Sequence, residues 1–183
     1  MLYVEQSLGP DEELIHVGQF HWMYTVHAFL AIVWGIVIST LIVVGGVVVY
    51  KQLGHFPRGL PAMEGVQYLH PGIRIAGFIA FVLGVLSFAQ MMVVKATTEI
   101  AITNNRLVYK RGLVARSVGE MSIDRIEGVN VLQTILGRIF NYGRLAVRGM
   151  GVGEVILPPL DDPIIFRQAI ERAKATKRRM PDV

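Results

Sequence analysis

Two long stretches of the chain contain no Lys, Arg, Asp or Glu: residues 14–50 and residues 75–94. About 20 apolar residues in a helix suffice to cross the hydrocarbon core of a bilayer. The pattern therefore predicts a transmembrane hairpin with spans over residues 24–50 and 75–94. Residues 51–74, which include several prolines and glycines, are expected to form the loop between the two spans.

After residue 94 the pattern changes to short runs in which apolar and polar residues alternate. Such alternation predicts strands, with glycines and paired asparagines at the turns. The expected strands cover residues 99–103, 106–110, 113–117, 118–123, 126–133, 142–148 and 152–157. Residues 134–140 are expected to form a short helical turn. Asp162 followed by Pro163 is typical of the cap and first residue of a helix, which ends the chain.

These patterns predict a membrane protein of three parts. Residues 1–22 are expected to form a segment at the membrane interface, residues 23–94 the hairpin, and residues 95–183 a folded domain with a basic tail. The domain is predicted to be a small α+β fold, a bent antiparallel sheet or partial barrel capped by the C-terminal helix. The first residues are acidic and lack the basic region of a signal peptide, so no cleavable signal is predicted.

Composition agrees with a membrane protein and limits its chemistry. Hydrophobic residues make up 52% of the chain, and there is no cysteine, which excludes disulfides and thiolate metal sites. Of the 18 lysines and arginines, all except Lys51, Arg58 and Arg74 lie at or after Lys95. A basic domain beside a bilayer attracts anionic lipids. Because no nucleic-acid-binding motif accompanies this charge, membrane lipids and not nucleic acids are the expected partners.

Both predicted spans carry small residues at every fourth position. The two stripes consist of Ala31, Gly35 and Ser39 in the first span and of Ala76, Ala80 and Gly84 in the second. Small residues let helix backbones approach closely. The stripes therefore predict a helix-packing face, which serves either the hairpin itself or association with another copy or another membrane subunit.

Several short motifs follow the second span: Thr103–Arg106 with Leu107 and Tyr109, the Arg111–Gly112 turn, Ile123, Ile126, Gln133, Gly137–Arg138 and Tyr142–Gly143. Through these motifs, residues 102–149 resemble the bacterial pleckstrin-homology-like domain found in small membrane proteins. The resemblance includes His21 and Trp22 before the first span and covers nearly the whole chain. It implies a pleckstrin-like fold in the bacterial inner membrane. Such folds mostly bind lipids or proteins and are rarely catalytic.

The basic residues around the Gly112 turn are Arg106, Lys110, Arg111 and Arg116. In eukaryotic pleckstrin domains, basic residues on an early hairpin hold phosphoinositide phosphates, so the resemblance implies that these four could bind a lipid headgroup. Ordinary surface charge is the alternative. A second basic group near the C-terminus would lie close to an anionic membrane surface: Lys174, Lys177, Arg178 and Arg179.

Two other patterns have simpler explanations than a functional site. The chain has five histidines, His16, His21, His27, His55 and His70. Their spacing matches no zinc motif, and in a hairpin His27 lies at the opposite membrane face from His55 and His70, so a haem or metal-bearing redox subunit is the weakest hypothesis. Gly149, Gly151 and Gly153 precede a strand-like segment, which favours a hairpin turn over a phosphate-binding loop.

The leading hypothesis is a non-enzymatic protein of the bacterial inner membrane, with no cofactor. Its domain would mediate protein docking, in a homo-oligomeric scaffold or as an accessory subunit of a larger membrane complex. The alternative is a module that binds anionic lipid headgroups. The heavier basic load of the C-terminal domain favours both termini on the cytoplasmic side.

Overall fold

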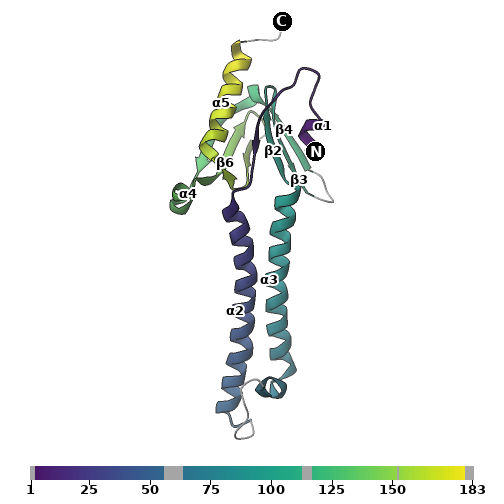
Figure 1. Ribbon diagram of the computed structural model, residues 1–183, viewed down its shortest axis with the longest axis vertical. Coiled ribbons are helices and arrows are strands. Elements are labelled where there is room, and N and C mark those ends of the chain that lie inside the picture. The colour runs from purple at the N-terminus through teal and green to yellow at the C-terminus, as the bar shows by residue number, and fades with distance from the viewer. Residues whose placement is uncertain (1–2, 56–63, 113–116, 152, 180–183) are drawn as a thin grey trace. The chain divides into compact units, whose positions relative to one another are not determined.

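The computed structural model describes residues 3–55, 64–112, 117–151 and 153–179 (Figure 1). The chain divides into two compact units. Residues 25–92 form one, here called the helical unit, and residues 1–24 together with 93–183 form the other, here called the β unit.

Two long helices dominate the helical unit: α2 (Trp22–Gln52) and α3 (Pro71–Thr97), with the short 3-10 helix η1 (Glu64–Tyr68) before α3. Both are long and apolar enough to cross a membrane, with mean hydropathies of 2.6 and 2.2 over their most apolar 18-residue segments. Only 11% of each of these segments is buried in the structure. Trp34, Leu41 and Phe78 are 62%, 66% and 66% exposed, so these helices differ from the buried core helix of a soluble protein.

The two helices pack against each other through glycine. A methyl group added at Gly84 would lie 2.8 Å from the Cα atom of Gly35 and 2.9 Å from the Ala31 carbonyl oxygen. A methyl group added at Gly35 would lie 2.9 Å from the Gly84 Cα atom and 3.4 Å from the Ala80 carbonyl oxygen. The backbones therefore approach closely because neither glycine has a side chain.

Five of the six small residues of the predicted stripes lie at or near this contact, and one does not. Ser39 faces Gly77, where an added methyl group would lie 3.5 Å from the Ser39 carbonyl oxygen. Ala76 is exposed, and its neighbour Gly77 is buried against α2 in its place. The five residues Ala31, Gly35, Ser39, Ala80 and Gly84 thus lie between the two helices of one chain.

The β unit contains two antiparallel sheets. The first has the order β1-β2-β3-β4, formed by β1 (Leu14–Gly18), β2 (Glu99–Thr103), β3 (Arg106–Arg111) and β4 (Ser117–Ser122). The second is formed by β5 (Ile126–Leu132), β6 (Tyr142–Gly149) and β7 (Gly153–Ile156), with β8 (Leu160–Asp161) paired to β6. The short helices are α1 (Tyr3–Gln6), η2 (Ile123–Arg125) and α4 (Ile135–Ile139).

The C-terminal helix α5 (Pro163–Arg179) closes the core of the β unit. Figure 1 shows it lying alongside the strands, in yellow. Its fully buried Phe166 and Ile170 share one apolar cluster with Ile100 from the first sheet and Leu145 from the second. The predicted arrangement of antiparallel strands followed by a closing helix is therefore present, and α5 begins at Pro163 as predicted.

The boundary near the N-terminus differs from the expectation. Residues 14–18 do not belong to a separate interfacial segment or to the first span; they form β1, the edge strand that pairs antiparallel with β2. Gly18 permits close packing there, because an added methyl group would lie 2.9 Å from the Phe166 ring. The uninterrupted uncharged stretch 14–50 thus contains a strand and a helix. The predicted strand 113–117 lies, except for Ser117, outside the described residues.

Candidate functional site

Arg106, one of the four expected headgroup ligands, is instead tied to the N-terminal segment. Its Nε and Nη2 atoms donate to the two carboxylate oxygens of Glu12 at 2.9 and 2.8 Å. Its Nη1 atom donates to Glu120 at 2.8 Å, and Nη2 also donates to the Ser7 carbonyl at 2.7 Å. With these contacts made, the guanidinium group holds the segment before β1 against the first sheet.

The carboxylate partner of this pair is buried. The Glu12 side chain is 5% exposed and accepts hydrogen bonds from the Thr103 hydroxyl at 2.7 Å and the Gly9 amide at 3.0 Å. Burial by itself would raise the pKa of Glu12, but the hydrogen bonds from Thr103, Gly9 and Arg106 and the charge of Arg106 lower that pKa below its ordinary value.

Acidification is expected to loosen the N-terminal segment. A glutamate whose pKa is lowered by folding stabilises the native state above its unfolded pKa, about 4.3 for an ordinary glutamate. That stabilisation is lost as the pH falls below this value and through the lowered native pKa. Hydrogen exchange of the β1 amides in the full-length protein, compared at pH 7 and pH 3 after correction for intrinsic exchange, should show reduced protection at pH 3. Equal protection of the wild-type amides at the two pH values would contradict this role of Glu12. The same loss of protection at pH 3 in the Glu12→Gln variant would contradict it as well.

The other residues of the basic hairpin are not gathered into one site. Lys110 forms an ion pair with Glu99, its cross-strand partner, at 2.9 Å. Arg111, at the end of β3, is exposed, and Arg116 lies outside the described residues. Within the described part of the hairpin, therefore, only Arg111 lacks a carboxylate partner.

The basic tail is partly tied to the core as well. Lys177 forms an ion pair with Asp124 of η2 at 2.9 Å, which fixes the end of α5 against the start of the second sheet. Lys174 is half-buried and Arg178 is exposed. The side chain of Arg179 lies outside the described residues.

A small cavity forms around two arginines from different sheets. Arg111 of β3 and Arg144 of β6 line a space of about 200 Å³. The other lining residues are Tyr24, Val94, Tyr109, Ile156, Leu157, Pro158 and Pro159. Tyr24 is in the first turn of α2 and Val94 in the last turns of α3, and both belong to the β unit. We call this space the arginine cavity.

A cluster of exposed apolar side chains lies on α4 and at the start of α2. We call it the α4 patch, and its members are Ile135, Leu136, Ile139, Phe140 and Trp22, which are 81%, 56%, 68%, 41% and 55% exposed. The rings of Trp22 and Phe140 meet edge to face, with centroids 5.8 Å apart. The patch is thus continuous with the first residue of α2.

The local sequence explains why α4 turns its apolar residues outward. The Thr134 hydroxyl caps the helix by accepting from the Gly137 amide at 3.1 Å. Gly137 is buried, because an added methyl group would lie 2.6 Å from the Tyr142 carbonyl oxygen. Gln133 donates to that same carbonyl at 3.2 Å. With its glycine face held against β6, the helix leaves the isoleucines and Leu136 exposed.

Histidines cap both long helices. The Nδ1 atom of His21 accepts from the Met23 amide at 3.1 Å, and the Nδ1 atom of His70 accepts from the Gly72 amide at 3.1 Å. His21 is 4% exposed and stacks on Tyr142 with ring centroids 5.1 Å apart. These contacts fix the start of α2 on β6. Among the described residues, no group of three or more His, Asp or Glu side chains is arranged to hold a metal ion.

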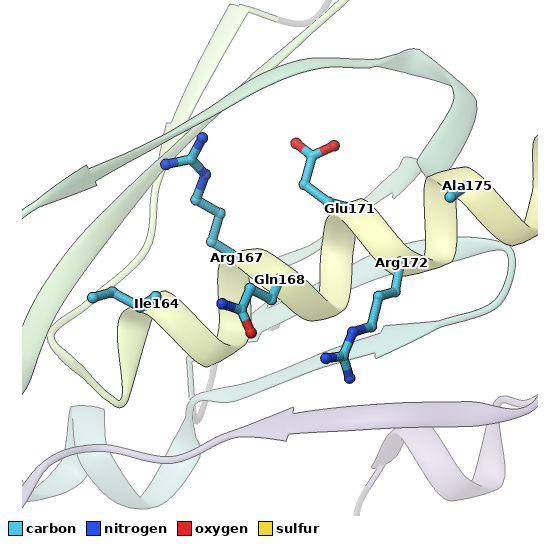
Figure 2. Close-up of a pocket in the computed structure, with 6 residues that line it drawn as sticks. All are labelled: Ile164, Arg167, Gln168, Glu171, Arg172 and Ala175. Carbon is cyan, nitrogen blue, oxygen red and sulfur yellow. The ribbon is translucent and has the colours of Figure 1, made fainter.

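A shallow hollow of about 480 Å³ runs along the outer face of α5 (Figure 2). Its lining residues are Ile164, Arg167, Gln168, Glu171, Arg172 and Ala175. Figure 2 shows Arg167 and Glu171 extending to one side of the helix and Arg172 to the other. Because the lining comes from one helix face and its polar groups diverge, the hollow has the character of a surface and not of a reaction site.

Sequence reasoning missed both the arginine cavity and the outward-facing α4 patch. Arg144 and Tyr24 are 120 positions apart, and neither lies in a recognisable motif. The apolar residues of 134–140 were expected as a helical turn, but their exposure is not evident from their periodicity. Of the residues of this surface, the sequence singled out only Trp22, which precedes the first predicted span in the family resemblance.

The comparison with protein families supplies the identity. The model of the family described as Bacterial PH domain matches residues 14–174. Neither the curated proteins nor the solved structures contain a match to the chain. The match begins at the first residue of β1 and ends within α5, so it includes both long helices and both sheets. The chain therefore belongs to the bacterial PH domain family.

Proposed function

We propose that this protein is a non-enzymatic integral protein of the bacterial inner membrane whose PH-like domain docks on the lipid surface. The observation that carries the proposal is the α4 patch. A soluble monomeric domain rarely exposes a contiguous cluster of large apolar side chains, and such a cluster marks a contact with a membrane or a partner.

Membrane insertion is supported by the two long helices. They have the length and the apolar surface that a bilayer requires, and their large side chains are exposed along most of that length. Exposure of this surface to water would be unfavourable, because removing apolar area from water stabilises a protein by roughly 25 cal/mol per Å².

The connections support docking on the bilayer. Thr98 alone separates α3 from β2, and only residues 19–21 separate β1 from α2. One extended residue spans at most about 3.6 Å, so the strands of the domain follow the helices without a long linker.

The position of the α4 patch favours lipid as its partner. Trp22 is the first residue of α2 and contacts Phe140, so the patch lies level with the end of a proposed span. Tryptophan at the end of a span prefers the interface between headgroups and hydrocarbon. The isoleucines of α4 would then insert into the same layer.

Protein docking is the second candidate, and α5 supplies its observation. Ile164 and Ile165 are 50% and 51% exposed at the start of this helix, beside the hollow shown in Figure 2. An accessory subunit of a membrane complex, or a second copy in a homo-oligomeric scaffold, would use this face.

Depth-dependent quenching tests the lipid-docked arrangement. Because the chain contains no cysteine, Ile139→Cys and Glu127→Cys each allow a single fluorescent label on the full-length protein in liposomes. Position 139 is in α4, which follows the Leu132 end of β5, and position 127 is near the other end of that strand, about 17 Å from Leu132 along it. Brominated lipids are expected to quench the label at 139 at least twice as strongly as the label at 127. Equal, weak quenching at both positions would exclude docking through the α4 patch.

A further inference from the structure

We propose that α3 pairs with α3 of a second copy of this chain, with Gln90 at the contact between the two helices. The proposal rests on the membrane insertion proposed above and is independent of docking through the α4 patch. The second copy would cover a face of α3 that α2 leaves exposed.

Gln90 carries an unpartnered amide on the exposed surface of α3. Its side chain forms no hydrogen bond with any residue that the structure describes, whereas the nearby Ser87 hydroxyl donates to the Leu83 carbonyl at 2.8 Å. Gln90 lies four positions before Val94, the end of the proposed second span, so its Cα atom is about 6 Å inside that span. An amide without a partner is unfavourable in hydrocarbon, and polar side chains of membrane helices therefore face one another or a cavity.

The Gln90 amide is directed away from the nearer membrane surface. Side chains of an α-helix lean toward the N-terminus of that helix. Because α3 runs from Pro71 to Thr97 and Gln90 is close to its C-terminal end, this lean carries the amide toward the middle of the span. Water at the nearer interface is therefore a poor substitute for a protein partner.

The face of α3 that carries Gln90 has a regular repeat. Ala76, Leu83 and Gln90 recur at intervals of seven residues, and all three are exposed. Gly77 and Gly84, which pack on α2, each lie one position further along the chain. One position corresponds to about 100° around a helix, so the seven-residue face is separate from the face that α2 covers. A seven-residue repeat keeps two supercoiled helices in contact along their length.

A second copy is the occupant that this face fits. A glutamine amide both donates and accepts, so two Gln90 side chains that face each other satisfy one another. A pair of copies inserted in the same direction is related by a two-fold axis along the membrane normal, which places identical residues of the two α3 helices opposite each other. Ala76 permits close approach of the backbones. A single polar residue in such a contact fixes its register.

Disulfide cross-linking of the full-length protein in liposomes tests the contact, because the chain has no cysteine of its own. Leu83→Cys places a thiol on the seven-residue face, and Val85→Cys places one about 200° around the helix at nearly the same depth. The native side chains at these positions are 58% and 38% exposed, so neither is covered by α2. Oxidation with copper phenanthroline should link Leu83→Cys into dimers about five times as fast as Val85→Cys, or faster. Equal rates would overturn the proposal.

Moving the amide tests the role of Gln90 itself. Gln90→Leu removes the amide, and Ala89→Gln/Gln90→Ala keeps the composition while turning the amide by about 100° around the helix. Association is measured by energy transfer between donor-labelled and acceptor-labelled Glu127→Cys copies as lipid is added. Both variants should associate about fivefold more weakly than the chain with native residues at 89 and 90, because the hydrogen bonds between the copies are lost. Undiminished association in either variant would overturn the proposal.

Extraction with sodium carbonate separates this proposal from the proposed function. A protein that stays in the membrane fraction but is not cross-linked at position 83 contradicts the pairing alone. A protein that carbonate removes from the membrane contradicts insertion and pairing together. Quenching of the label at position 139 should be unchanged in Gln90→Leu, because the α4 patch takes no part in the contact between the two α3 helices.

Discussion

Replacing Gly35 by leucine is expected to break the packing of α2 on α3, with a loss of about 3 kcal/mol in unfolding free energy or complete loss of the helix contact. The new side chain would begin 2.9 Å from the Cα atom of Gly84 and 3.4 Å from the Gly84 amide nitrogen. These are backbone atoms, so no rotamer change on α3 relieves the clash, and the helices must separate.

Gly45→Leu is the matched control, because it lies in the same helix and an added methyl group there would meet nothing within 4 Å. Both variants and the wild type would be unfolded by titrating sodium dodecyl sulfate into mixed micelles, with helicity followed by circular dichroism. A leucine at position 35 that is as well tolerated as one at position 45 would show that the close contact between the glycines does not hold the hairpin.

Arg106→Ala is expected to release the N-terminal segment, at a cost of about 3 kcal/mol, because it leaves the buried Glu12 carboxylate without its cation. Val4 of α1, which is 2% exposed and packs with Ala101 and Val108, would lose its support along with the segment. Since about 1.4 kcal/mol corresponds to a factor of ten, exchange of the β1 amides should accelerate roughly 100-fold.

The double variant Arg106→Ala/Glu12→Gln separates charge from packing. The neutral amide can still accept from the Thr103 hydroxyl, so the double variant should be more stable than Arg106→Ala alone. Glu120→Ala, which removes the more exposed partner of Arg106 at 39% side-chain exposure, should cost less than about 1 kcal/mol. If Arg106→Ala proves no more harmful than Glu120→Ala, the buried pair is not what fixes the segment.

Local patterns were sufficient to predict most elements. The period-two alternation from residue 99 matches β2 over Glu99–Thr103, and the Asp162-Pro163 pair marks the start of α5. These predictions hold because alternation and capping chemistry act over a few neighbouring residues. The unusual backbone at Asp162, with φ 45°, was not predicted; it accompanies a hydrogen bond from its amide to the Asn141 carbonyl, a tertiary contact.

Contacts between distant residues account for the features that were missed. β1 was assigned to an interfacial segment over residues 1–22 because residues 14–50 carry no charge, and only pairing with β2 distinguishes a strand there. Arg106 resembled a free headgroup ligand because its carboxylate partner is 94 positions away. Arg144 carried no signal of its own, since its neighbour in the cavity, Arg111, belongs to another sheet.

The central claim is that the two apolar helices cross the bilayer and hold the PH-like domain against one face of it. Single cysteines at His55, after α2, and at Thr176, in α5, would be labelled with a membrane-impermeant maleimide in sealed inner-membrane vesicles of defined orientation. The two positions should be labelled from opposite sides, with Thr176→Cys reacting from the cytoplasmic side. Labelling of both positions from the same side would contradict the two-span arrangement and the docked domain with it.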